Sequence, residues 1–129
     1  MFHSSAFDYI DILDKAADAG WLRNQALANN IANATTPGYK REDVAFEAQL
    51  QKALGSRKNE PMDTKVKNLD PDSLKPLPYT DYEGYSYRLD GNNVDPDNEY
   101  VMLAENSIKY QGLIDGLTKE FENLQRVMK

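Results

Sequence analysis

The chain has 129 residues, a length that suits one domain and leaves too little sequence for two. Its net charge of −6 argues against a nucleic-acid partner, because such binding needs clustered Lys and Arg side chains that neutralise phosphates. It contains no cysteine, which excludes a disulfide framework and a thiolate zinc site.

The first predicted element is a long amphipathic helix over about residues 6–34, a stretch without proline. Small and apolar residues recur there in steps of three and four, the spacing of one helix face and close to a heptad seam. This first seam consists of Ile10, Leu13, Ala17, Gly20, Asn24, Leu27, Ile31 and Ala34. The opposite face is polar and is expected to face water; it carries Asp8, Asp11, Lys15, Asp18, Gln25 and Asn29.

Pro37 and Gly38 are predicted to end this helix, because proline cannot continue a helix and disfavours a helical residue before it. A short second helix is expected from about Asp43 to Leu54. Residues 55–96 then contain five prolines and show little helical periodicity. We therefore expect an irregular insert, with one short strand or hairpin where polar residues alternate with Tyr85, Tyr87 and Leu89, followed by a turn at residues 90–93.

A second long helix is predicted from about Asp97 to near Met128. Acidic residues at its start and basic residues at its end complement the helix dipole. Its apolar positions again step by three and four. This second seam consists of Leu103, Asn106, Tyr110, Leu113, Leu117, Glu120 or Phe121, Leu124 and Val127.

These elements predict a mainly α fold in which the two long terminal helices pack as an antiparallel, coiled-coil-like pair. The chain is expected to form one domain with an N-terminal helical region (1–54), an insert (55–96) and a C-terminal helix (97–129). Aligned end to end, the helices bring Leu13 near Leu117 and Leu27 near Leu103. Asn24 and Asn106 occupy seam positions, where a buried asparagine can fix the register or can simply face water at the edge.

Two helices cannot cover both seams fully, so we expect partners to bury part of them. An isolated amphipathic helix is marginal in water, and each buried Leu or Ile contributes roughly 1.5–3 kcal/mol. The ends of an isolated chain are therefore expected to be mobile. This pattern is typical of a self-assembling structural protein.

Residues 28–40 read ANNIANATTPGYK, and the C-terminal half contains GNNVD and LAENSIKYQ. The first segment resembles the N-terminal signature of the flagellar axial proteins of the rod and hook, A-N-N-I-A-N-x-x-T-P-G-Y, at every fixed position. The C-terminal segments resemble the FlgB-type proximal rod proteins within that family, whereas the related FlgC type usually has an R-A-Y-Q ending. The residues that carry the motif are Asn29, Asn30, Asn33, Thr36, Pro37, Gly38 and Tyr39.

The resemblance implies a structural subunit of the flagellar basal body rod, which forms a hollow shaft in the periplasm. It implies export by the flagellar type III apparatus without a cleaved signal peptide. Implied partners are copies of the chain, other rod proteins, a FliE-type adaptor, and the export gate or membrane-ring protein. The alternatives are another proximal rod subunit, of the FlgC type, and a soluble helical export chaperone or binding module. We expect the three asparagines to lie on the helix surface, where their amides can bond to neighbouring subunits.

Catalysis is poorly supported, and neither a cofactor nor a metal is expected. His3 is the only histidine and lies at the terminus, and the aspartates near it fit a solvated helix face. No apolar stretch approaches the roughly 20 residues of a membrane span. Phe46 and Leu50 have a spacing that resembles an export-gate recognition element, although simple packing on a helix explains such a pair more readily.

Overall fold

The computed structural model describes residues 5–55, 59–82 and 88–129. It confirms the predicted fold class: two long terminal helices pack together, and a small two-stranded antiparallel sheet lies between them in the sequence. The elements in chain order are α1 (Ser5–Ala32), β1 (Glu42–Val44), α2 (Phe46–Gly55), α3 (Met62–Lys67), the 3-10 turn η1 (Pro71–Ser73), β2 (Pro78–Thr80) and α4 (Pro96–Val127).

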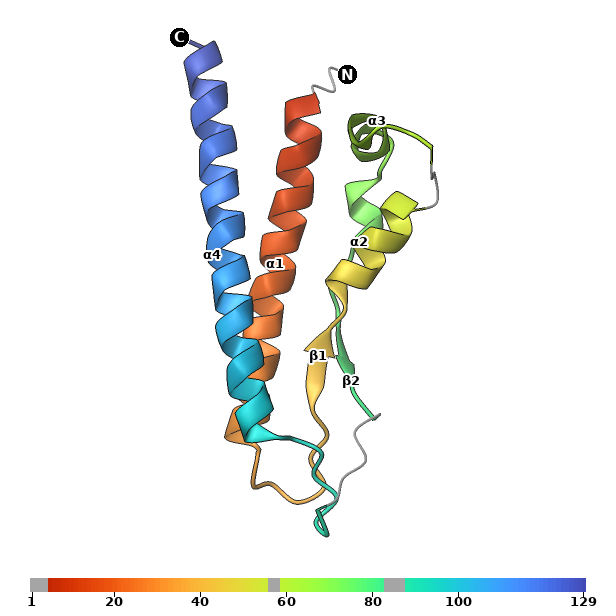
Figure 1. The fold of residues 1–129 in the computed structure, drawn as a ribbon, viewed down its shortest axis with the longest axis vertical. Coiled ribbons are helices and arrows are strands. Elements are labelled where there is room, and N and C mark those ends of the chain that lie inside the picture. Colours follow the sequence, from red (N-terminus) through yellow and green to blue (C-terminus); the bar gives the residue numbers. More distant parts are fainter. Residues whose placement is uncertain (1–4, 56–58, 83–87) are drawn as a thin grey trace.

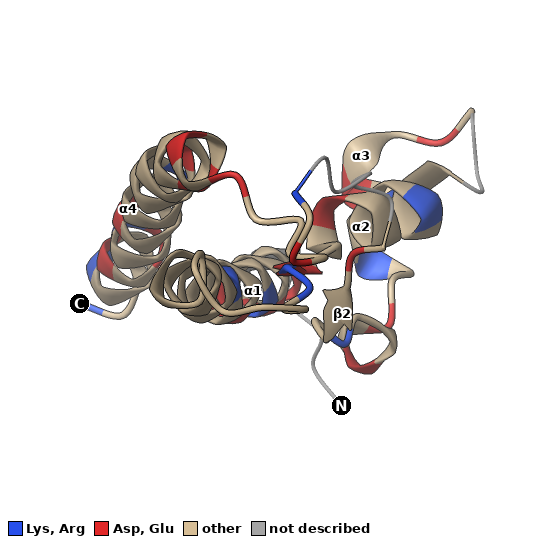
Figure 2. Ribbon diagram, turned by 90° about the horizontal axis from the view of Figure 1, so that it is seen from below, with Lys and Arg blue, Asp and Glu red and all other residues tan. Residues whose placement is uncertain are grey.

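The helices α1 and α4 run antiparallel, so the start of α1 and the end of α4 lie at the same end of the molecule (Figure 1). Seen along the helices, α1 lies between α4 and the segment that contains α2 and α3 (Figure 2). The loops that connect α1 to β1 and lead into α4 meet at the opposite end (Figure 1). We call this the closed end, and we call the first turns of α1 with the last turns of α4 the open end.

The local sequence explains where the long helices begin and end. Beyond Ala32 the chain forms turns, and Gly38 adopts a φ of +71°, a backbone conformation that favours glycine. The helix α4 begins at Pro96, in the first turn of the helix, where the missing proline N–H costs no hydrogen bond. The helix predicted from Asp43 begins only at Phe46, because residues 42–44 form β1 instead.

The sheet lies at a different place from the predicted strand. Strand β1 pairs with β2, with Glu42 opposite Thr80 and Val44 opposite Pro78. Of the residues expected to form a strand, Tyr85 and Tyr87 lie outside the described residues, and Leu89 is fully exposed in a turn. Strands of three residues contain too few positions to show an alternating pattern, which is why the sequence did not reveal this pair.

A small core forms on the side of α1 that faces away from α4. Val44, Phe46 and Leu74 pack there against Ala19 of α1, with Leu50 beside them. Residues of the insert thus cover part of α1, and α3 and η1 continue this layer. One consequence corrects the predicted solvated face: Asp8 is buried at 9% exposure and lines a pocket together with residues that follow α3, such as Leu69.

Candidate assembly interface

The two long helices meet along the predicted seams. The side-chain amide of Asn106 in α4 donates to the backbone oxygen of Gly20 at 2.9 Å and to Oδ1 of Asn24 at 2.8 Å. Asn106 is buried at 4% exposure, so both seam asparagines bond across the helix pair rather than only to water. A Cβ atom on Gly20 would lie 3.2 Å from Cδ2 of Tyr110. The missing side chain of Gly20 therefore lets the ring of Tyr110 approach the backbone of α1 closely.

A second contact fixes the register towards the open end. A Cβ atom on Gly116 would lie 4.0 Å from Cδ1 of Leu13. Leu13 therefore packs beside Gly116, which directly precedes its predicted neighbour Leu117 in the sequence. Together with the contact between Gly20 and Tyr110, this agrees with the antiparallel register predicted from the sequence.

Burial along the seams is uneven. In α1 the seam residues Ile10, Ala17 and Leu27 are buried, and Leu27 has 0% exposure. The five remaining positions of the first seam are only partly buried: Leu13, Gly20, Asn24, Ile31 and Ala34. In α4 only Asn106 of the second seam is buried. Five other positions of that seam are partly buried: Leu103, Tyr110, Leu113, Leu117 and Leu124.

The second seam ends differently from the prediction. Glu120, not Phe121, is the partly buried residue near the end of α4, and Phe121 is 52% exposed. Val127, which was expected to belong to the seam, is 85% exposed. The last turn of α4, which ends at Val127, extends past the first turn of α1, so no helical turn of α1 covers it (Figure 1).

The asparagine-rich motif turns inward at the closed end. Asn30 has 0% exposure, and its amide nitrogen donates to the backbone oxygen of Glu42 at 2.8 Å and to Oε2 of Glu99 at 3.0 Å. Its Oδ1 accepts from the backbone N–H of Glu42 at 2.9 Å and from the Tyr39 hydroxyl at 3.3 Å. The expectation that all three asparagines face neighbouring subunits is therefore wrong for Asn30, because one buried amide joins α1, β1 and α4.

The rest of the motif shapes the turn after α1. Asn33 donates to the backbone oxygen of Asn29 at 2.8 Å and accepts from the Thr36 hydroxyl at 3.1 Å. The backbone N–H of Gly38 donates to the oxygen of Asp90 at 2.7 Å, which joins the motif to the loop before α4. Burial raises the pKa of the Tyr39 hydroxyl, and the negative charges of Glu42 and Glu99 raise it further. Asn29 and Pro37 are exposed.

Asn92, in the loop before α4, stabilises the same turn through hydrogen bonds. Its buried amide nitrogen donates to the backbone oxygens of Asn33, Ala34 and Thr36 at 2.8, 3.2 and 2.9 Å. Its Oδ1 accepts from the backbone N–H of Val94 at 2.8 Å. Helix C-termini leave backbone carbonyl groups without partners inside the helix, and Asn92 supplies a donor to those that follow α1.

Arg41 forms the ionic centre of the closed end. Its Nε donates to Oε1 of Glu99 at 2.6 Å, its Nη1 to Oδ2 of Asp81 at 2.7 Å, and its Nη2 to Oδ2 of Asp43 at 3.2 Å. Burial by itself would lower the pKa of Arg41, but the hydrogen bonds that Arg41 donates to Glu99 and Asp81, together with the charges of Glu99 and Asp43, outweigh it and raise the pKa. Arg41 therefore stays charged and links β1 to α4. We call Asn30, Tyr39, Arg41, Asn92 and Glu99 the clasp.

Comparison with the sequences of known proteins places the chain in a family. No protein-family model matches the chain. The flagellar basal body rod protein FlgB of Bacillus subtilis strain 168 is 32% identical over 120 residues, which cover 92% of each chain. FlgB of Escherichia coli K12 is 32% identical over 117 residues and 83% of each chain. The chain belongs to the FlgB family of flagellar basal body rod proteins. FlgB of Borreliella burgdorferi is 30% identical over 129 residues, covering 94% of this chain and 90% of the relative.

Two clasp residues of this FlgB family member were missed by the reasoning from sequence. Arg41 was not singled out, and Glu99 was noted only as an acidic residue at a helix start, although it is 1% exposed. Asn92 was expected only in a turn, yet it lies in the GNNVD segment that carries the family resemblance. That segment was the available signal, since asparagine in a turn can bond to the backbone.

Two further expectations concern export and membranes. Phe46 of this FlgB family member is buried at 5% exposure in the small core, with Leu50 packed beside it, so the pair serves the packing of α2 in the folded chain. Among the described helices, none is both long enough and apolar enough to cross a bilayer. His3 lies outside the described residues.

Proposed function

We propose that this FlgB family member is a structural, non-enzymatic subunit of the proximal flagellar rod, and that copies of it pack through the two seams against one another and against other axial proteins. The observation that supports this most directly is the incomplete burial of the second seam. Leu103, Leu113 and Leu124 are only partly buried in the single chain. Further apolar surface on the same seam can be removed from water only by another subunit.

Exposed apolar side chains on both long helices support the same proposal. Large apolar residues of α1 and α4 that are at least half exposed are Phe7, Trp21, Tyr100, Val101, Ile108, Phe121 and Val127. Scattered exposed apolar residues are ordinary on a protein surface, but here they follow two paired helices along most of their length. Such a surface fits a subunit that is surrounded by neighbours in an assembly.

The clasp has a separate role in this proposal. Its hydrogen bonds lie within one chain, so it sets the geometry of each subunit, while the seams and the exposed apolar residues make the contacts between subunits. Four of the motif residues are exposed and can contact neighbours: Asn29, Thr36, Pro37 and Gly38.

The proposal includes export by the flagellar type III apparatus and assembly in the periplasm, with a FliE-type adaptor and the export gate or membrane-ring protein as neighbours. The experiment is to express the tagged chain in a flagellated host that lacks its own FlgB, with and without a functional export apparatus, and to purify basal bodies. We expect the chain in the rod fraction only when export works. A chain that stays in the cytoplasm as a folded monomer or dimer in both strains would instead favour a chaperone or binding module.

A substitution in the seam tests how the subunit assembles. Leu113→Asp places a charge on a partly buried position, and we expect it to cost the single chain about 1 kcal/mol while abolishing rod incorporation and motility. Asn123→Asp, at an exposed position of α4, is the matched control and should leave both unchanged. A motile strain that carries Leu113→Asp would contradict the assembly role of the seam.

A further inference from the structure

Each seam repeats every seven residues, so apolar contact alone does not specify how far α4 slides along α1. One row of the second seam consists of Leu103, Tyr110, Leu117 and Leu124. One row of the first seam consists of Ile10, Ala17, Asn24 and Ile31. The other row of the first seam consists of Leu13, Gly20, Leu27 and Ala34. A slide by one repeat, about 10 Å along the helix axis, superposes each row on itself and again opposes mostly apolar side chains.

The repeat is interrupted at one place on each helix, and the two interruptions contact each other. Asn24 is the polar member of its row, and Gly20 is the member of the other row that has no side chain. Asn106, buried in α4, donates from its amide nitrogen to the backbone oxygen of Gly20 at 2.9 Å and to Oδ1 of Asn24 at 2.8 Å. A Cβ atom on Gly20 would lie 3.2 Å from Cδ2 of Tyr110, so this ring fits where the backbone is bare. We call Gly20, Asn24, Asn106 and Tyr110 the lock.

A slide by one repeat separates the members of the lock. Asn106 would then face Ala17 or Ile31, whose side chains accept no hydrogen bond. The ring of Tyr110 would face a leucine side chain of the first seam in place of the bare backbone of Gly20. A buried donor that loses its partners lowers the equilibrium constant for pairing about tenfold or more. The lock therefore distinguishes registers that the apolar rows do not.

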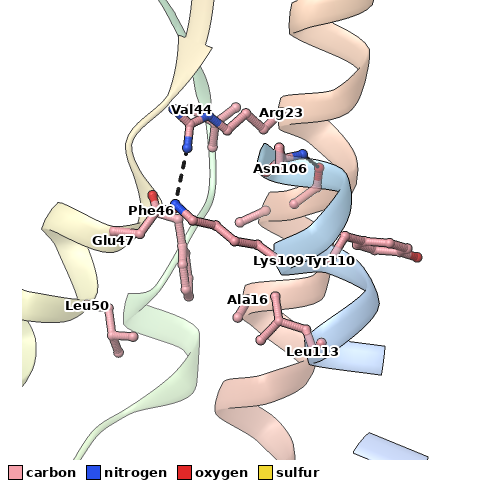
Figure 3. A pocket seen from close by; sticks show the side chains of 13 residues that line it. Ala16, Arg23, Val44, Phe46, Glu47, Leu50, Asn106, Lys109, Tyr110 and Leu113 are labelled. Atoms are coloured by element: carbon pink, nitrogen blue, oxygen red, sulfur yellow. Dashed lines mark hydrogen bonds and ion pairs between the residues drawn. The ribbon is translucent and has the colours of Figure 1, made fainter. Parts of the chain in front are cut away.

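We infer that the lock selects the register in which α1 and α4 pair, with Asn24 and Asn106 as its specificity-determining residues. The clasp joins the two helices within one chain, but it places no restriction on a helix of another copy. Such a helix can approach the second seam beside the lock, because Asn106, Tyr110 and Leu113 line an apolar groove of about 370 Å³ (Figure 3). A buried amide in an otherwise apolar seam gives a defined register at some cost in stability. This inference goes beyond the proposed function, because it concerns the free chain and its tests do not involve the rod.

Replacing both asparagines by leucine separates register from stability. Asn24→Leu with Asn106→Leu, which we call the leucine pair, exchanges a buried hydrogen bond for apolar contact. We expect its melting temperature to be unchanged or higher, because replacing both partners of a buried hydrogen bond is close to neutral. At equal concentration the leucine pair should still form larger species about tenfold more readily than the original chain, as measured by sedimentation. A folded leucine pair that sediments like the original chain would contradict the inference.

Cysteine pairs report the register directly, since the chain has no cysteine of its own. Leu13→Cys with Gly116→Cys reports the observed register, because a Cβ atom on Gly116 would lie 4.0 Å from Cδ1 of Leu13. Leu13→Cys with Asn123→Cys reports a pairing that is slid by one repeat. With the lock intact, we expect a disulfide within one chain from the first pair and little from the second. In the leucine pair, the second pair of cysteines should link two copies, with at least about tenfold more disulfide-bonded dimer.

Gln25→Leu with Ser107→Leu is the matched control, because it adds two leucines at exposed positions next to the lock asparagines. This control should keep the observed register. Asn24→Ala with Asn106→Ala removes the hydrogen bonds without adding volume, so it should also increase the slid-register dimer, even if the leucine pair does not fold. Slid-register dimers that are as frequent in the control, or absent from both asparagine variants, would overturn the inference.

Discussion

The closed and open ends of the helix pair are stabilised in different ways. At the closed end, Asn30, Asn92 and Glu99 have at most 1% exposure, and hydrogen bonds within the chain satisfy their polar groups. At the open end, Phe121 and Val127 are exposed and α4 has no buried residue after Asn106. Helix α4 is thus held by buried polar side chains near the closed end and has no buried side chain along its second half.

The buried hydrogen bonds and the exposed apolar surface have different roles: the first set the shape of the chain, and the second bind partners. Buried hydrogen bonds require particular distances and angles, so the clasp specifies how β1 and the start of α4 meet α1. Apolar surface is far less directional and gains free energy from any partner that excludes water. A subunit that must keep its own shape while it packs against several neighbours benefits from having the two kinds of contact at different places.

Placing the same charged residue in each end should show the largest difference between them. Leu27→Asp buries a charge at a position with 0% exposure, and we expect a loss of about 5 kcal/mol, enough to unfold a chain of ordinary stability. Leu124→Asp, at a partly buried position of the open end, should cost about 1 kcal/mol. Urea unfolding followed by circular dichroism measures both. Equal losses would mean that the two ends are packed alike.

Removing the ionic centre of the clasp should have the next largest effect. Arg41→Met leaves the 1% exposed carboxylate of Glu99 without its guanidinium partner, and breaking a buried ion pair costs about 3–5 kcal/mol. Adding Glu99→Gln removes the orphaned charge, so the double variant should be more stable than the single one. If Arg41→Met unfolds at the same urea concentration as the original chain, Arg41 does not hold the closed end together.

A smaller loss is expected at the turn after α1. Asn92→Ala removes the donor that serves the backbone oxygens of Asn33, Ala34 and Thr36, and should cost about 1–3 kcal/mol. Asn29→Ala, in the exposed part of the motif, should change the free energy of unfolding by no more than about 0.5 kcal/mol. The two alanine variants therefore separate the buried from the exposed asparagines, and similar losses would contradict that division.

The sequence was sufficient for the long helices because many residues report the same period. Repeated steps of three and four from Ile10 to Ile31 and from Leu103 to Leu124 predicted both helices and, together with their lengths, the antiparallel register. Near the end of α4 the pattern could not decide between Glu120 and Phe121 as the seam residue. Too few apolar positions follow them to show which of the two continues the steps of three and four.

The clasp and the sheet could not be predicted in the same way. The hydrogen bond between Arg41 and Glu99 joins residues that are 58 positions apart in the sequence. A periodic pattern within one helix or strand cannot reveal such a pair. Asn30 was expected on the helix surface, where its amide could bond to a neighbouring subunit, whereas the amide here bonds to the backbone of β1 and to the carboxylate of Glu99 in α4. The family motif identified this region without showing in which direction its side chains point.

The smallest expected effect concerns Tyr39, which belongs to the clasp. Burial and nearby carboxylates raise its pKa above the ordinary value of 10.0, so the unfolded chain releases this proton at a lower pH than the folded chain. The stability associated with neutral Tyr39 is therefore complete below about pH 10 and is lost as the pH rises through the higher, folded-state pKa. Tyr39→Phe removes this contribution and a long hydrogen bond of 3.3 Å to Asn30.

We expect Tyr39→Phe to cost at most about 1 kcal/mol at pH near 8, because the hydrogen bond it removes is long. The variant should lose less stability than the original chain when the pH is raised to about 11. The pKa of Tyr79 is also raised by burial and by the carboxylates of Asp43 and Asp81, so both chains should lose some stability in alkali. The difference between the two urea unfolding curves at each pH isolates the contribution of Tyr39. Parallel losses would mean that this hydroxyl ionises as easily in the folded clasp as in the unfolded chain.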